Sequence, residues 1–327
     1  MVISNVMKHW GPRSKLVMAA FIMAVTGHGQ MVSPVVLGTA GTTDPLPGGG
    51  TLSWTLGEMI IGMQGSDALF ITEGFQQGSR VRVCLNIKAL LQGAWSGTEG
   101  LMHDHLRMEG FIPQFAPYEE AAYPRVADPT WSFVPAAVLA TDGADAVVDW
   151  VYLELRDALD TSAVVATRRA LLQRDGDIVD LDGLSAVTFY RPSGTYFIAV
   201  HHRNHLPVLT LHPVQLSEAP AMVDLTDGST PTYGNEAQSM EDGRFLLWCG
   251  DITADGLVRY AGAGNDRDAI LLTIDGAVPT SVAFGYWPAD VNMDGIVRYV
   301  GAQNDRDLVL ITIGGSIPTA VRQAQMP

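Results

Sequence analysis

Cysteine is nearly absent from this chain of 327 residues, which contains only Cys84 and Cys249. Two cysteines allow at most one internal disulfide, so a small scaffold held together by several disulfide bonds is excluded. The sequence leaves open whether these two thiols pair or stay free, because separation along the chain says nothing about distance in space.

Basic residues are also scarce, with 20 Lys and Arg against 35 Asp and Glu and a net charge of −15. Binding to nucleic-acid phosphates requires clustered Lys and Arg, so this balance argues against a nucleic-acid partner. An acidic surface suits divalent cations better.

Long apolar runs are missing except for one of eleven residues, Leu16–Thr26, which is too short to cross a bilayer core of about 30 Å. Three basic residues precede this run and small residues follow it, in the order typical of a secretory signal peptide: Lys8, Arg13, Lys15, then Gly27 and Gly29. We expect a signal peptide over residues 1–29 with cleavage after Gly29. The mature chain is then secreted or held at the cell surface, without a transmembrane segment.

No long stretch shows helical periodicity, whereas short runs of β-forming residues alternate with turns such as Asp175-Gly176 and Asp182-Gly183. This texture predicts a mainly β chain with a β-sandwich over residues 81–216, preceded by an extended or β segment over residues 30–80. The predicted strands are Thr51–Leu56, Ala68–Thr72, Arg80–Leu85, Ala146–Leu155, Ala163–Thr167, Ala186–Tyr190 and Thr195–His201.

Residues 217–244 are rich in Ser, Thr, Pro, Gly, Asp and Glu, a composition that favours an acidic linker. We therefore expect the β region to fold independently of residues 245–327.

The C-terminal part contains an internal repeat of period 39, which aligns Asp251–Ile274 with Asp290–Ile313. Fifteen of the 24 aligned residues are identical, and both copies begin with D-x-[TN]-x-D-G. This pattern matches the first half of an EF-hand-type calcium loop, in which positions one, three and five supply side-chain oxygens and position seven a carbonyl. The predicted ligands are Asp251, Thr253, Asp255 and Leu257 in the first copy, and Asp290, Asn292, Asp294 and Ile296 in the second.

The twelfth position of a standard loop carries a bidentate carboxylate, but here it is Gly262 or Gly301. Both copies continue with N-D-R-D before an apolar run, so a longer loop could return a later Asp to the ion. The candidates are Asp266 or Asp268 in the first copy and Asp305 or Asp307 in the second.

The D-V-N-M-D-G-I-V start at Asp290 and the D-L-V-L-I continuation at Asp307 resemble the two half-motifs of a cellulosomal dockerin. This resemblance implies a small module of two calcium loops and short helices over residues 245–327, with Ca²⁺ as cofactor and a cohesin-like protein as partner.

The phrases G-L-M-H-D-H-L-R, V-V-D-W-V-Y-L-E-L-R-D and H-R-N-H-L resemble parts of large surface proteins of Bacteroidota. That resemblance implies secretion and a non-catalytic β architecture, and it brings no active site.

Other groupings have simpler interpretations. Histidines at positions 103, 105, 201, 202 and 205 could indicate zinc, but their spacing is not characteristic, and acids at 175, 177, 180 and 182 suit turns between strands. Asx-rich turns could likewise explain the repeat without any ion. Carboxylate pairs such as Glu119-Glu120, or Asp149 with Glu154, are the only glycosidase-like feature.

We therefore expect a secreted or cell-surface binding or structural protein that recognises a protein or a glycan, rather than an enzyme. The alternative is an accessory component or hydrolase of an extracellular polysaccharide-degrading assembly, since dockerins usually accompany catalytic modules.

Overall fold

The computed structural model describes residues 81–118, 121–128 and 132–327, together with the backbone of four earlier strands. The chain divides into two units, residues 1–79 and residues 80–327. In the first unit, β1 (Ala40–Pro45) pairs with β2 (Thr51–Leu56), and β3 (Gly62–Ser66) pairs with β4 (Leu69–Glu73), both antiparallel. The predicted signal segment, residues 1–29, lies outside the described residues.

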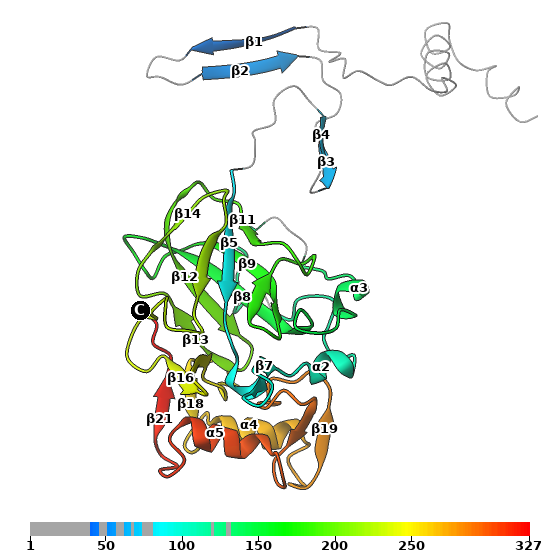
Figure 1. Cartoon of the computed structure of the whole chain (residues 1–327), viewed down its shortest axis with the longest axis vertical. Helices are drawn as coiled ribbons and strands as arrows, with labels where there is room; N and C mark the ends of the chain where they lie inside the picture. Colours follow the sequence, from blue (N-terminus) through cyan, green and yellow to red (C-terminus); the bar gives the residue numbers. More distant parts are fainter. Residues whose placement is uncertain are drawn as a thin grey trace, which may run out of the picture. The chain divides into compact units, whose positions relative to one another are not determined.

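The main feature of the second unit is one nine-stranded sheet, in the order β11-β5-β10-β9-β8-β12-β13, with β14 beside β12 and β15 beside β5 (Figure 1). Its strands are β5 (Val83–Lys88), β8 (Val147–Asp157), β9 (Val164–Gln173), β10 (Asp177–Val179), β11 (Val187–Phe189), β12 (Gly194–His202), β13 (His205–Leu209), β14 (Val214–Leu216) and β15 (Ala221–Asp224). The strands predicted from residue 80 onward are all present, and the chain is mainly β.

The predicted two-sheet sandwich is corrected to a single curled sheet. The Cys84 N–H donates a hydrogen bond to the Ser217 carbonyl at 2.8 Å, which brings the chain after β14 next to β5. Alternating apolar residues predict a strand, but they do not say which strand lies beside it, so the sequence could not separate these two arrangements.

Residues 217–244 do not form a linker. Strand β15 pairs in parallel with β5, and Val223 and Leu225 are buried in the same core as Leu85. Strands β16 (Gln238–Glu241) and β17 (Arg244–Leu247) form a hairpin in the remaining part. This stretch therefore contributes strands and buried side chains to the same compact unit as the sheet.

The sheet is covered on both faces, because ten of the eleven residues of β8 are buried. Short elements contribute to this cover: η2 (Gln92–Ala94), β6 (Trp95–Ser96), β7 (Leu101–Met102), α2 (His105–Met108) and α3 (Ala136–Leu139). Cys84 and Cys249 are free thiols. Cys249 is buried beside the Thr312 hydroxyl, and burial raises its pKa to about 12.

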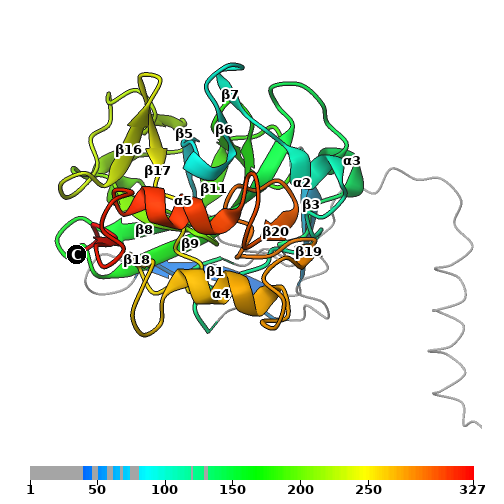
Figure 2. The same ribbon diagram turned by 90° about the horizontal axis from the view of Figure 1, so that it is seen from below.

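The two repeats share one architecture, in which a loop leads into a short strand, a helix and a final strand. The first contains β18 (Leu257–Arg259), α4 (Asp266–Thr273) and β19 (Val282–Phe284), and the second contains β20 (Ile296–Arg298), α5 (Asp305–Thr312) and β21 (Val321–Gln323). Helices α4 and α5 lie next to each other below the sheet and enclose a second, smaller core (Figures 1 and 2).

The repeats exchange their final strands. Strand β19 of the first repeat pairs with β20 of the second, and β21 of the second pairs with β18 of the first. Both pairings are antiparallel. The strands correspond across the 39-residue period of the sequence, because β21 begins 39 residues after β19 and β20 begins 39 residues after β18. In each repeat, the strand that follows the loop is therefore paired with the final strand of the other repeat. Among the described residues, no helix has the length and apolarity needed to cross a bilayer.

Candidate metal centres

The first carboxylate of each D-x-[TN]-x-D-G motif organises its loop through the backbone. Asp290 accepts hydrogen bonds from the Asp294 and Gly295 N–H groups at 3.1 and 2.9 Å, and Asp251 accepts from Asp255 and Gly256 at 3.1 Å each. The glycine at the sixth position has a positive φ of 77° or 85°, a conformation in which other residues are strained. The sharp turn predicted from the sequence is therefore formed in both copies.

A second carboxylate closes each loop from the start of the following helix. Asp305 accepts from the Val291 and Asn292 N–H groups through Oδ1 and from Arg298 through Oδ2, at 2.7, 3.2 and 2.7 Å. Asp266 makes the same three contacts with Ile252, Thr253 and Arg259. Both side chains are fully buried. These contacts tie the start of each helix to the start of its loop.

The structure separates the two candidates that the sequence left open in each copy. Asp268 and Asp307 point away from the loops, with side chains 51% and 52% exposed, and each pairs with the preceding arginine, Arg267 or Arg306. Their backbone N–H groups are capped by Asn265 and Asn304, so these two acids belong to the helix N-termini. Only Asp266 and Asp305 belong to the loops.

The buried carboxylates are electrostatically strained without a cation. Burial and the neighbouring Asp266 carboxylate raise the pKa of Asp251 to about 7, and burial likewise raises the pKa of Asp266. In the second loop, burial raises the pKa of Asp290 to about 6 and, together with the charge of Asp290, that of Asp305 to about 7. Two adjacent buried carboxylates that resist ionisation fit a site for a cation.

The fifth-position acids are partly neutralised by the chain itself. Asp255 pairs with Arg259 at 2.7 Å, and Asp294 pairs with Arg298. At the third position, Asn292 is held by the Gln303 carbonyl, while Thr253 is exposed. In the part of the chain that the structure describes, no three His, Cys, Asp or Glu side chains form a preassembled metal cluster. An ion would therefore combine the carboxylate pair with the third-position oxygen and with the carbonyl of Leu257 or Ile296, the first residues of β18 and β20.

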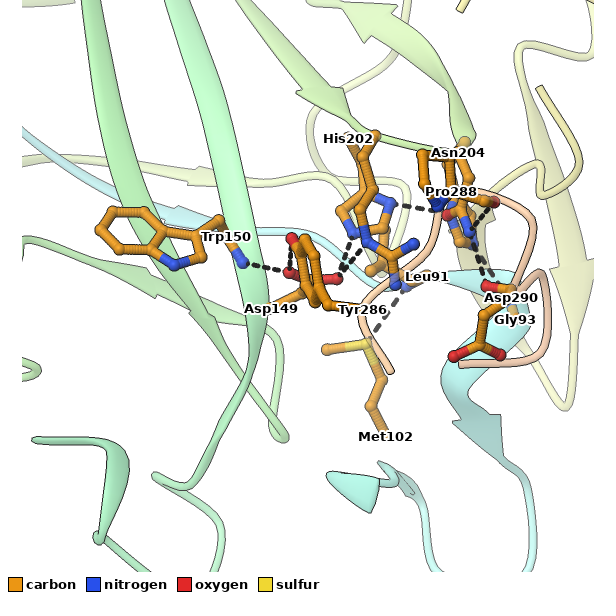
Figure 3. A network of polar contacts seen from close by, with 12 residues as sticks. Leu91, Gly93, Met102, Asp149, Trp150, His202, Asn204, Tyr286, Pro288 and Asp290 are labelled. Carbon is orange, nitrogen blue, oxygen red and sulfur yellow. Dashed lines mark hydrogen bonds and ion pairs between the residues drawn. The ribbon is translucent and has the colours of Figure 1, made fainter. Parts of the chain in front are cut away.

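The second loop is attached to the main sheet by a buried polar network that the sequence did not predict (Figure 3). The network begins at Asp149, which follows a β-bulge between Val147 and Asp149 in β8. Its carboxylate accepts from His202 at 3.1 Å, from Arg203 at 2.9 Å and from the Tyr286 hydroxyl at 2.5 Å. Although burial raises the pKa of Asp149, Arg203 and His202 outweigh this effect and lower it to about 2.

The turn between β12 and β13 extends this network to the loop itself. The Asn204 side-chain amide donates to the Pro288 carbonyl at 2.9 Å and to the Asp290 carbonyl at 2.7 Å, and Arg203 donates to the Trp287 carbonyl. The His103 ring bonds to the Asn292 carbonyl at 3.0 Å. A Cβ on Gly93 would lie 2.0 Å from the Val291 carbonyl oxygen, so the loop and η2 are in direct contact.

The histidines and the carboxylate pair that the sequence offered as candidate sites have structural partners instead. Among the histidines, His103 and His105 stack at 4.3 Å instead of converging on an ion. Glu154 pairs with Arg156 and His201, which lower its pKa to about 2 despite its burial. Asp149 and Glu154 therefore hold the fold together through separate ion pairs. Glu119 and Glu120 lie outside the described residues.

The acidic run of β10 and its turns also has structural partners. Asp177 pairs with Lys88, Asp180 pairs with Arg168, and Asp182 accepts from Ser185. Asp175 caps the turn through the Asp177 N–H. The turn interpretation of this run therefore agrees with the structure.

Comparison with protein-family models, curated proteins and solved structures gives no match.

Proposed function

We propose that this protein is a secreted or cell-surface, non-catalytic binding protein whose C-terminal repeats form a dockerin-like module held by two calcium ions. The observation that carries the proposal is the pair of buried carboxylates in each loop, Asp251 with Asp266 and Asp290 with Asp305. Calcium is the cation that best suits oxygen ligands in a D-x-[TN]-x-D-G loop. A bound ion would offset the repulsion within each pair.

The two parts of the proposal are consistent, because an exported chain would meet calcium at a concentration that loops of modest affinity can use. The signal peptide over residues 1–29 stays a prediction from the sequence. The calcium would serve the structure: it would hold the start of each helix against its loop and keep the second loop in place on the main sheet.

Isothermal titration of the chain from residue 30 with CaCl₂ tests this function. We expect two ions per chain with dissociation constants on the order of 10⁻⁴ M. Asp305→Asn should abolish binding at one site, because it removes the buried carboxylate of the second loop.

The matched control is Asp307→Asn, an exposed acid two residues further along the same helix, which should keep both sites. Absence of calcium binding at millimolar concentration, or equal losses in the two variants, would contradict the proposed function.

A further inference from the structure

A groove of about 850 Å³ lies between the second repeat and several short elements outside the main sheet. The second loop and helix α5 form one wall, and the short elements η2, β6 and α2 form the other, together with the end of β16. Its volume falls within the range of ordinary ligand sites. The stacked rings of His103 and His105 also line it, and His103 is bonded to the Asn292 carbonyl.

The lining of the groove contains four acidic side chains, two of which have no basic partner among the described residues. It includes Glu109, Glu241, Asp294 and Asp307, and none of its residues is a lysine or an arginine. Asp294 and Asp307 pair with arginines of their own repeat. By contrast, no lysine or arginine in the described part of the chain pairs with Glu109 or Glu241, and Glu241 only accepts a hydrogen bond from Gln92.

Apolar side chains line the same groove. Met108 is 66% exposed and Ile311 is 56% exposed, one on each wall. Trp95 also lines the groove and donates its ring N–H to Asp242 at 3.2 Å. Tryptophan and methionine are enriched in the cores of protein interfaces, and unpaired carboxylates favour a cationic partner.

From this combination we infer that the groove binds a polypeptide segment of a partner protein in which lysine or arginine stands next to an apolar residue. The cation would pair with Glu109 or Glu241, and the apolar side chain would pack on Met108, Trp95 and Ile311. The inference rests on the proposed function, because one wall is the second calcium loop. A neutral glycan could use Trp95 but would leave both carboxylates unpaired.

Fluorescence anisotropy can test this with the chain from residue 30 at about 1 mM calcium. The probe is a labelled short peptide of alternating leucine and lysine, and the comparison peptide carries glutamate in place of lysine. We expect the lysine peptide to bind, with an affinity that falls as salt rises, and the glutamate peptide not to bind. The double variant Glu109→Gln and Glu241→Gln should weaken binding by about tenfold or more.

The matched control removes two exposed acids outside the groove, through Glu218→Gln and Asp145→Asn, and should change affinity by less than about twofold. Equal weakening in both double variants would contradict the inference, because it would show only long-range attraction. Binding of the glutamate peptide, or binding of neutral oligosaccharides without the lysine peptide, would overturn it as well.

Calcium titration of the same samples separates the two proposals. Calcium binding without peptide binding would contradict only the inference about the groove. Peptide binding without calcium binding would contradict only the proposed calcium sites.

Discussion

His202 and His205 form a chain of buried hydrogen bonds in which the position of each proton follows from its partners. The Gly93 N–H can only donate, so Nε2 of His205 accepts at 3.1 Å and the ring proton lies on Nδ1. That proton faces the Asn204 oxygen at 2.8 Å and His202 Nδ1 at 2.9 Å. His202 then donates from Nε2 to Asp149. Both rings are neutral, and burial lowers the pKa of each.

This arrangement predicts that both histidines resist protonation in the folded protein. The unfolded chain takes up these protons near pH 6.5 and the folded chain does so only at lower pH. The stability that the pair contributes is therefore complete above about pH 6.5 and declines as the pH falls below it. A ¹⁵N NMR titration of the imidazole nitrogens measures this directly, and a pKa above 6.5 for either ring would show that the hydrogen-bond chain is wrong.

For single residues, the sequence predicted the sharp turn of each loop better than the acid that closes it. The D-x-[TN]-x-D-G spacing indicated which side chains organise the turn, because that geometry is local. The choice between Asp305 and Asp307 depended on where the helix begins, which Asn304 decides by capping it. The sequence offered Asp149 only as part of a carboxylate pair, and its role in the network could not be predicted, since a buried acid in a strand becomes informative only when Arg203 and Tyr286 are seen to meet it.

At the scale of elements, the exchange of final strands makes the two repeats depend on each other. Strand β18 has β21 as its partner, and the Ala324 N–H adds a hydrogen bond to the Gly256 carbonyl at 2.8 Å. Arg322 lies over the Trp248 ring, with its guanidinium 3.7 Å from the ring centroid. The last strand of the second repeat therefore stabilises the loop of the first.

We predict that removing residues 321–327 loosens the first loop and leaves the second one intact. Amide hydrogen exchange should become faster at Leu257–Arg259, which lose β21, and should stay slow at Ile296–Arg298, which keep β19. Strand β20 thus serves as an internal control in the same molecule. Unchanged exchange at Leu257–Arg259, or equally fast exchange in both strands, would exclude the proposed dependence.

The period of 39 residues predicted two copies of one unit, and both helices and both loops are present. It could not predict the exchange, because β19 and β21 are three-residue strands whose residues would suit pairing within a repeat equally well. Short strands carry little register information in their sequence, so their partners became known only from the structure.

At the scale of the whole molecule, residues 80–327 form one compact unit because the second loop rests directly on η2 and on the turn between β12 and β13. The sequence predicted a break over residues 217–244 from polar composition. The composition of a segment indicates how much of it faces water, but it does not indicate which distant residues it contacts. The hydrogen bond from the Tyr286 hydroxyl to Asp149 is one such long-range contact. The structure therefore contradicts a linker over residues 217–244, and independent folding of the β region stays a prediction.

Gly93→Ala should disrupt this attachment, because the added methyl would lie 2.0 Å from the Val291 carbonyl oxygen. Displacing the loop would leave Asn204 and Arg203 with unsatisfied buried groups, at a cost of about 1 to 3 kcal/mol each. We expect a loss of several kcal/mol in the free energy of unfolding, measured by urea denaturation.

Gly194→Ala is the matched control, since the nearest atom to its added methyl would be the Tyr196 hydroxyl oxygen at 3.4 Å, an ordinary van der Waals distance. It should have a much smaller effect. Equal stability of the wild type and Gly93→Ala would show that the loop is not held against η2.

We propose that calcium holds the repeats in place on the sheet, and thermal unfolding with calcium and with a chelator tests this role. At about 1 mM calcium, two sites of roughly 10⁻⁴ M should add about 1.4 kcal/mol each, and Asp305→Asn should remove about half of that gain. We expect a single cooperative transition that moves to a higher temperature with calcium, because repeats and sheet unfold together. Identical transitions with calcium and with chelator would contradict it.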